Sequence, residues 1–310
     1  MDLKQLRALV TVAETGNVTR ASALLNVVQP AVSRQLRLLE EDVGAALFER
    51  GRHGMELTDA GRTMLEYARR ILNEVARAKA EVRPSQGPVG GIVTVGLLAS
   101  TADLLATTLV TSVAASYPGI RLRILVGYAG HLADWLRSGE VDLALLYDQK
   151  RTPALQVKPL LEEALWAIGP ASARLRRDRP VPLAQVVRHP FVLPSAPHGL
   201  RALMEQAAAL MHLEFKVLAE TNALSVQKEL VAGGHGWTIL PAVAAAADIA
   251  RGTLTGAPLA EPALLRKIAL AAPAARQPSA PVRCVAAALL DCMRAAVRER
   301  RWAGARWLAD

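Results

Sequence analysis

Cysteine is scarce in this sequence, and long apolar runs are missing. Only Cys284 and Cys292 occur among the 310 residues, which excludes a disulfide framework and a cysteine-rich metal centre. The longest apolar stretches, such as residues 239–247, are shorter than the roughly 18–20 residues of a membrane-spanning helix. The amino-terminal residues lead into no secretory cleavage pattern. We therefore expect a cytoplasmic protein that does not associate with a membrane.

Motifs typical of enzymes are also missing. No G-x-G-x-x-G opens a strand–helix unit, and the sequence holds no P-loop, no H-E-x-x-H and no G-x-S-x-G. The six histidines form no cluster with the spacing of metal ligands. These absences predict a protein that is not an enzyme and that needs no cofactor or metal. A hydrolase site assembled from distant Ser, His and Asp residues stays open as an alternative.

Acidic residues are missing from one stretch in particular. The chain carries 37 Lys and Arg against 28 Asp and Glu, a net charge of +9. Residues 1–90 hold 13 basic and 11 acidic residues, so most of the excess lies beyond them. Positions 15–39, however, contain no acid and include Arg20, Arg34 and Arg37. This balance suits a nucleic-acid partner, and it equally describes a solvated arginine-rich surface.

The spacing of apolar residues predicts three short helices near the amino terminus. Gly16 ends the first helix at a left-handed cap, and Thr19 caps a second helix that turns Leu24 inward. Pro30 takes a first-turn position of the third helix, where its missing N–H is tolerated. The third helix buries Val32, Leu36 and Leu39 and leaves a polar, basic edge outside. Two short helices joined in this way are typical of a helix-turn-helix.

A hairpin and a long helix follow. Glycines at 51 and 54 between apolar residues predict a small wing with Arg50, Arg52 and His53 at its tip. Thr58 then caps a helix that runs to about Val82. Its apolar residues alternate four and three apart, which predicts pairing with the same helix of a second chain: Met64, Ala68, Ile71, Val75, Ala78 and Val82. Packing of this helix against its own domain is the alternative.

From Gly91 onwards, strands alternate with helices, and this pattern predicts mainly parallel sheets flanked by helices. A region of this length predicts two lobes with a cleft between them. We expect strands at residues 92–98, 120–126, 142–147, 191–193, 215–218 and 237–240.

The run from Ala21 to Gly61 carries the strongest signal. It contains A-x-x-L, Q-P-A-x-S-x-Q-x-x-x-L-E, L-F-x-R and L-T-x-A-G in this order. In order and spacing it resembles the LysR-type family of bacterial transcriptional regulators. The long helix and the α/β region fit the same family, so the resemblance covers essentially the whole chain. Residues 193–201 and 220–241 look like the second effector lobe, near the nitrogen-assimilation-control branch.

The resemblance implies an α/β protein with an N-terminal winged helix-turn-helix domain at 1–58 and a linker or dimerisation helix with a hinge at 59–87. Residues 88–310 would form an effector-binding domain with two lobes, similar to periplasmic binding proteins. Lobe I would comprise about 88–164 and 268–310, and lobe II about 165–267. The implied function is promoter binding on the bacterial nucleoid, modulated by a small effector in the cleft. The implied assembly is a homodimer through the linker helix and a homotetramer.

DNA-reading roles fall on the start of the third helix. Gln pairs with adenine, Arg grips guanine through two donors, and Pro touches a thymine methyl in the major groove. By resemblance these positions are Gln29, Pro30, Ser33 and Arg34.

Other positions suit contacts with the phosphate backbone, which add affinity but little sequence information. These are Thr19, Arg20, Arg37, Arg50 and Arg52. A solvated helix face is the alternative for Arg34 and Arg37, and bracing of the wing through Glu49 or Glu56 is the alternative for Arg50.

Effector-binding roles fall at the carboxyl ends of the expected strands, where open α/β sheets bind ligands. Ser100 and Thr101 start a helix and offer hydroxyls and free N–H groups to an anion. The basic balance of the region favours an acidic metabolite. The alternatives are helix capping by Ser100 and Thr101 and a structural hydrogen bond at His198. The full set comprises Ser100, Thr101, Tyr128, Tyr147, His198, Arg201, Thr221 and Asn222.

Cys284 and Cys292 are eight residues apart in the last expected helix. They are therefore ~12 Å apart along its axis, too far for an unstrained disulfide. We expect core thiols rather than a peroxide sensor. Two other functions stay open for the whole chain: a small-molecule sensor without DNA binding, and an α/β enzyme acting on an acidic substrate.

Overall fold

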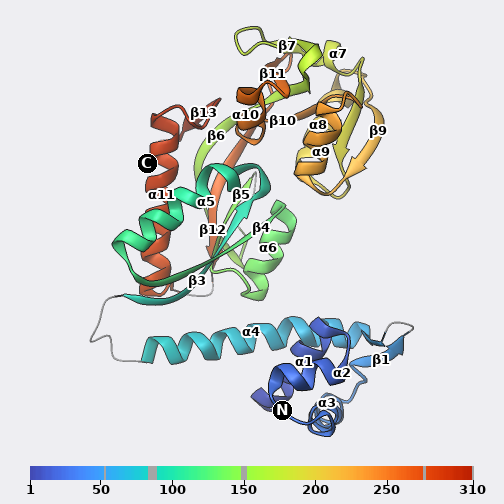
Figure 1. Cartoon of the computed structure of the whole chain (residues 1–310), viewed down its shortest axis with the longest axis vertical. Helices are drawn as coiled ribbons and strands as arrows, with labels where there is room; N and C mark the ends of the chain where they lie inside the picture. Colours follow the sequence, from blue (N-terminus) through green and yellow to red (C-terminus); the bar gives the residue numbers. More distant parts are fainter. Residues whose placement is uncertain (52–53, 83–88, 148–151, 275–276, 309–310) are drawn as a thin grey trace. The chain divides into compact units, whose positions relative to one another are not determined.

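The computed structural model describes residues 1–51, 54–82, 89–147, 152–274 and 277–308 (Figure 1). The chain divides into two compact units. One comprises Met1–Gln86 with Arg137–Glu140, and the other comprises Gly87–Leu136 with Val141–Asp310. None of the helices that the structure describes combines the length and the apolar character needed to cross a membrane.

The first unit is a helix-turn-helix followed by a hairpin and a long helix, as the sequence predicts. The hairpin strands pair antiparallel, with Phe48 opposite Leu57 and Arg50 opposite Met55. Residues 52–53, at the expected tip of the wing, lie outside the described residues. The elements are α1 (Leu3–Thr15), α2 (Val18–Leu25), α3 (Gln29–Val43), β1 (Phe48–Gly51), β2 (Gly54–Leu57) and α4 (Asp59–Val82).

Asn17, and not Thr19, caps α2. The Asn17 side chain accepts hydrogen bonds from the backbone N–H groups of Thr19 and Arg20, at 2.8 and 3.1 Å. Thr19 therefore lies inside the first turn, because asparagine is among the best capping residues and stands two positions earlier. Leu24 was expected in the core and is instead 67% exposed, since it lies outside the face that Ala21 and Ser22 bury.

The core of the first unit includes part of the apolar stripe on α4. Ala68 is fully buried, and Met64 and Ile71 pack against the same cluster of α1 and α3 side chains. The alternative, packing of this helix against its own domain, therefore holds for the amino-terminal half of the stripe. Val75 is partly buried and Ala78 is exposed.

The second unit contains a nine-stranded sheet of mixed direction. β3 (Gly90–Leu98) pairs in parallel with β4 (Gly119–Gly127) and β5 (Leu143–Tyr147). β12 (Leu265–Pro273) and the long β6 (Leu155–Pro170) pair antiparallel to each other. The expectation of mainly parallel sheets is therefore wrong. Parallel pairs form at the ends of the fold, whereas the strands that cross between its halves run in opposite directions.

Two hydrophobic cores lie within this unit, and β6 contributes to both. Leu160 and Leu161 belong to the first core, and Leu165 and Ala167 belong to the second. β6 and β12 run side by side from one core to the other (Figure 1). Burial of these leucines contributes roughly 1.5–3 kcal/mol each, so the crossing strands are firmly held at both ends.

The remaining elements surround these two cores. Helices α5 (Ala99–Ser116), α6 (Ala129–Ser138) and α11 (Ala280–Arg298) bury apolar side chains in the first core. Helices α7 (Leu183–Val186), α8 (Gly199–Leu210), α9 (Leu224–Ala232) and α10 (Ala242–Arg251) contribute to the second. The other elements are η1 (Ala171–Ala173), β7 (Val181–Pro182), β8 (Pro190–Pro194), β9 (Lys216–Thr221), β10 (Thr238–Pro241), β11 (Leu254–Ala260) and β13 (Ala305–Trp307).

Cys284 and Cys292 both lie on α11 and are free thiols. Each is only partly buried, so the expectation of core thiols is wrong in this respect. Burial raises the pKa of the Cys292 thiol, which keeps it protonated and poorly reactive at neutral pH.

Thr58 joins the hairpin to α4. Its hydroxyl donates to the Ala46 carbonyl at 2.7 Å and accepts from the Gly61 N–H at 2.9 Å. We expect Thr58→Ala to lower the free energy of unfolding of the first unit by about 1 kcal/mol, because it removes a helix cap. Thr58→Ser keeps the hydroxyl and serves as the control. Hydrogen exchange of the amides in the first turn of α4 would measure the effect; equal protection in both variants would contradict this role.

Candidate DNA-reading helix and effector cavity

Helix α3 has one apolar face and one polar face. Val32, Leu36 and Leu39 are buried in the core of the first unit. The opposite face exposes the four side chains expected to read bases, Gln29, Pro30, Ser33 and Arg34, together with Arg37, which is expected to contact a phosphate. The polar face of α3 is therefore not buried by the rest of the unit.

Local contacts order part of this polar face. The Gln29 side-chain amide donates to the Ser33 hydroxyl at 3.1 Å, which aligns two of the expected base contacts one turn apart. Arg37 lies 3.7 Å from Glu41, and both side chains are well exposed, so this ion pair contributes little. Val28 precedes the helix without a side-chain capping bond, which leaves the first amides of α3 without a side-chain acceptor.

The expected phosphate contacts are placed unevenly. Thr19 and Arg20 are exposed in the first turn of α2. Arg50 lies on β1, but its side chain is outside what the structure describes, as is the whole of Arg52. The hairpin itself is fixed to the turn between α1 and α2, because the Met55 N–H donates to the Gly16 carbonyl at 2.9 Å.

Gly54 makes this attachment possible. Its φ of +128° disfavours any other residue, and a Cβ atom at this position would collide with the Gly16 carbonyl oxygen. The base of the wing is therefore held close to the helix-turn-helix.

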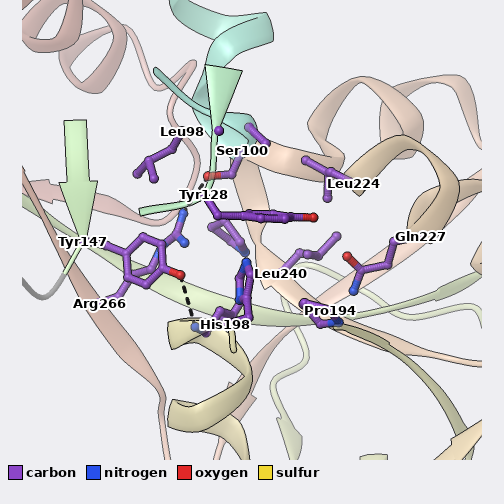
Figure 2. Close-up of a pocket in the computed structure, with 14 residues that line it drawn as sticks. Leu98, Ser100, Tyr128, Tyr147, Pro194, His198, Leu224, Gln227, Leu240 and Arg266 are labelled. Atoms are coloured by element: carbon purple, nitrogen blue, oxygen red, sulfur yellow. Dashed lines mark hydrogen bonds between the residues drawn. The ribbon is translucent and has the colours of Figure 1, made fainter. Parts of the chain in front are cut away.

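A cavity in the second unit collects side chains from both of its cores (Figure 2). Four of the eight expected effector-binding residues line it: Ser100, Tyr128, Tyr147 and His198. The part of the cavity that the centre of a water molecule can occupy has a volume of about 30 Å³. This is room for roughly two or three water molecules.

The other four expected residues do not line this cavity. Thr101 is fully buried, and its hydroxyl donates to the Leu98 carbonyl at 3.0 Å. Arg201 is paired with Glu205 at 2.7 Å and Glu220 at 2.8 Å, and these carboxylates raise its pKa. The Thr221 hydroxyl accepts the Ala223 N–H at 3.1 Å, and Asn222 is exposed. The sequence places all four residues near strand ends, but it does not show on which side of the strand end each side chain lies.

Four helices begin at the cavity wall. Leu98, His198, Ala223 and Pro241 are the capping residues of α5, α8, α9 and α10, and none makes a side-chain capping bond. The alternative that Ser100 and Thr101 cap a helix is therefore wrong, because α5 already starts at Ala99. One first-turn amide is already bonded, because the Leu200 N–H of α8 donates to the Tyr147 hydroxyl at 3.2 Å. The positive ends of the helix dipoles favour negative charge at such places.

Arg266 is the main cavity residue that the sequence did not reveal. It lies on β12, is only 3% exposed, and donates through Nε to Glu163 at 2.6 Å. Its Nη2 donates to the Ser100 hydroxyl at 2.8 Å, and its guanidinium lies 4.8 Å from the Tyr147 ring centroid. Glu163, on β6, also accepts the Trp302 indole N–H at 2.7 Å. A charged residue at an inward position of an apolar strand is the signal that sequence analysis missed.

His198 presents two buried ring nitrogens without a hydrogen-bond partner. The alternative of a structural hydrogen bond at this histidine is therefore wrong for the described residues. Its ring meets Tyr128 edge-on at 4.3 Å between centroids and lies 6.3 Å from Tyr147 (Figure 2). Burial, followed by the charges of Arg266 and His131, lowers the pKa of His198 to about 4. His198 is thus neutral at pH 7. Burial and Tyr147 also raise the pKa of Tyr128.

The polar part of the cavity wall is small and contains no acid. Among the described residues its polar side chains are Ser100, Tyr128, Tyr147, His198, Gln227 and Arg266, and the rest of the wall is apolar or glycine. Gln227 donates to the Val192 carbonyl and to the Thr238 hydroxyl, so its amide is fixed. In the part of the chain that the structure describes, no three His, Cys, Asp or Glu side chains are placed to hold a metal ion.

The buried pair of Glu163 and Arg266 should contribute to the stability of the second unit. We expect Glu163→Gln to destabilise the second unit by about 3 kcal/mol, because it leaves the Arg266 charge buried without a counter-ion. Glu162→Gln is the matched control, since Glu162 pairs with Arg306, which is 77% exposed. Its cost should be below about 1 kcal/mol. Urea unfolding of both variants measures the difference, and equal costs would contradict the assignment.

His198 generates a second prediction. Its folded pKa, about 4, lies below the unfolded value near 6.5, so the unfolded chain binds a proton first as the pH falls. The stability present above pH 6.5 is therefore lost between about pH 6.5 and 4. Allowing for partial solvent screening, the wild type should lose about 1 kcal/mol more than His198→Asn between pH 7 and pH 5. Calorimetric unfolding at both pH values tests this; parallel losses would refute it.

The amino-acid sequence matches two family profiles. Residues 3–62 match the profile described as "Bacterial regulatory helix-turn-helix protein, lysR family". Residues 86–294, more than half of the chain, match the profile described as "LysR substrate binding domain". The two matches correspond to the helix-turn-helix and to the unit that contains the cavity.

Similar proteins have nearly the same length. The HTH-type transcriptional regulator BbuR of Bordetella bronchiseptica is 29% identical over 98% of this chain and 94% of its own. The nitrogen assimilation regulatory protein nac of Klebsiella aerogenes is also 29% identical, over 79% of this chain and 80% of its own. Full-length CbnR, solved in complex with its target DNA, has a TM-score of 0.69 at 23% identity, covering 95% of this chain and 99% of that one. This structural likeness establishes the fold. The chain belongs to the LysR family of DNA-binding transcriptional regulators, with a helix-turn-helix domain followed by an effector-binding domain.

Proposed function

We propose that this chain reads promoter DNA with the exposed face of α3 and that a small anion in the cavity changes how it binds. The observation that carries the proposal is the division of α3 into a buried apolar face and an unoccupied polar face. A helix of this kind, presented by a helix-turn-helix, fits the major groove. The structural relative CbnR was solved with its target DNA, which supports the same use here. The protein would act on the bacterial nucleoid.

Base contacts would come from the start of α3. Gln29 suits an adenine edge, Arg34 suits guanine, and Pro30 suits a thymine methyl. Ser33 supports Gln29 through the hydrogen bond between their side chains. The positive end of the α3 dipole suits a phosphate, because helix amino termini attract anions.

Backbone contacts would surround this helix. Thr19 and Arg20 face solvent at the start of α2, and Arg37 is exposed one turn beyond Arg34. Arg50 and Arg52 would add contacts from the wing. Such contacts supply affinity and make it fall with salt, since each neutralised phosphate releases counter-ions.

The effector would be held by residues from both cores of the second unit. Ser100, Tyr128, Tyr147 and His198 line the cavity together with Arg266. The positive ends of four helix dipoles, an arginine and a wall without acid all favour an acidic metabolite. Thr101, Arg201, Thr221 and Asn222 do not line the cavity and have no role in this proposal.

Regulation would follow from the position of the cavity between the two cores. The cores are joined by β6 and β12, so a ligand touching both favours one arrangement of them. The ligand shifts this equilibrium only by its difference in affinity for the two arrangements. Pairing through the carboxyl-terminal part of α4 would form a homodimer, and further contacts would form a homotetramer that spans a promoter with two half-sites.

Replacing Arg34 tests the DNA-reading role. We expect Arg34→Ala to weaken binding to a preferred promoter fragment by about 1–3 kcal/mol, because one base contact is lost. Binding to unrelated duplexes should change little, so the preference between the two shrinks. Lys4→Ala removes another exposed positive charge of the same unit and is the control.

Gel-shift titrations of a genomic fragment and a scrambled duplex, at two salt concentrations, measure both affinities. Dimerisation of each variant is checked by sedimentation. An unchanged preference in Arg34→Ala would rule out α3 as the reader. A wild type that ignores duplexes at low salt would instead favour a sensor or an enzyme that does not bind DNA.

A further inference from the structure

We propose that the cavity binds a small monoanion, and that His198 takes up one proton from the solvent when this anion arrives. The resulting imidazolium and the guanidinium of Arg266 would then hold the ligand together, with no bond of the ligand changed. The inference rests on the proposed role of the cavity as an effector site. It adds the charge of the ligand and a residue that selects for it.

The chain itself offers His198 no hydrogen-bond partner. Both ring nitrogens are buried and lack a partner, and buried polar atoms without hydrogen bonds are costly. A neutral imidazole has one donor and one acceptor, whereas an imidazolium has two donors. A ligand that offers only acceptors, such as a carboxylate, satisfies His198 fully only after protonation. The geometry therefore couples an anionic ligand to a proton.

The charges that the chain places around His198 oppose its protonation. The positive groups near His198 are Arg266 on β12 and His131 on α6. The ring centroid of His131 is 6.1 Å from that of Tyr128. The raised pKa of Tyr128 keeps its phenol neutral. On α8 itself, Arg201 is neutralised by Glu205 and Glu220. These groups and burial keep the pKa of His198 at about 4.

Charge balance specifies one negative charge on the ligand. Glu163 is fully buried and compensates Arg266, so the pair carries no net charge. Protonation of His198 adds one positive charge, which a monoanion cancels. A dianion would leave a buried negative charge even after this protonation, which is costly in such surroundings. A neutral ligand would bring no charge that an imidazolium could balance.

The size of the cavity limits the ligand in this state of the protein. With about 30 Å³ open to the centre of a water molecule, it holds a carboxylate group with few further atoms. Formate and glycolate are therefore suitable probes, and both remain ionised above pH 5. Formamide and glycolamide are the uncharged counterparts of similar shape. A larger monoanion requires the two cores to move apart.

The test measures the protonation of His198 directly. Full-length protein with isotope-labelled histidine is titrated with acid, alone and with saturating glycolate, and the ring signal absent from His198→Asn is followed by NMR. Glycolate should raise the pKa of His198 towards its ordinary value near 6.5, and glycolamide should not. If that value is reached, the dissociation constant for glycolate falls about eightfold from pH 7 to pH 5.5.

Two variants control this measurement. His198→Asn keeps a polar, neutral side chain and should bind glycolate with no such pH dependence. His235→Gln changes an exposed histidine outside the cavity and should match the wild type. Thermal unfolding at pH 7, where His198 is neutral, shows whether each variant is folded.

Three results would overturn the inference. If glycolate binds and the pKa of His198 stays unchanged, the proposed uptake of a proton is wrong. If glycolate and glycolamide bind equally well, the proposed preference for a monoanion is wrong. No response of the His198 signal to formate or glycolate rejects this class of ligand. None of these affects the Arg34→Ala gel shift, so failure here is distinguishable from failure of the proposed DNA-binding function.

Discussion

The buried ion pair between Glu163 and Arg266 is the interaction on which the second unit depends. It joins β6 to β12, the two strands that pass between the hydrophobic cores. Trp302 holds one end of the pair, and Ser100 and Tyr147 meet the other. The same arginine therefore braces the crossing strands and forms part of the cavity wall. The Arg266 guanidinium places a positive group at the cavity wall. Because Glu163 balances its charge, the pair adds no net charge there.

The first unit is organised by a different constraint, the need of each helix to bury one face. α3 buries its leucines and keeps its polar edge exposed. α4 contributes Ala68 to the same core, whereas Ala78 of the same apolar stripe is exposed. The unit itself therefore buries only part of this stripe.

Much of the DNA-binding unit could be predicted from the sequence because its signals are local. The capping glycine Gly16, the first-turn Pro30 and the cap Thr58 fix helix ends within a few residues of themselves. The error over Thr19 arose between two neighbouring capping residues, where Asn17 is the better acceptor. Ser33 and Arg34 could be placed on the exposed edge because helical spacing alone decides which side chains share a face.

The sequence by itself determined the family, the helix-turn-helix and the residues on the exposed face of α3. It also placed Ser100, Tyr128, Tyr147 and His198 at the ends of strands. Only the tertiary structure decided which of these meet in one cavity, because that depends on the side of each strand end and on contacts between distant segments. Arg266 reaches Glu163 across 103 positions of the chain, and no periodicity records such a pairing. The unpartnered nitrogens of His198 arise in the same way, from the packing of elements that are remote in sequence.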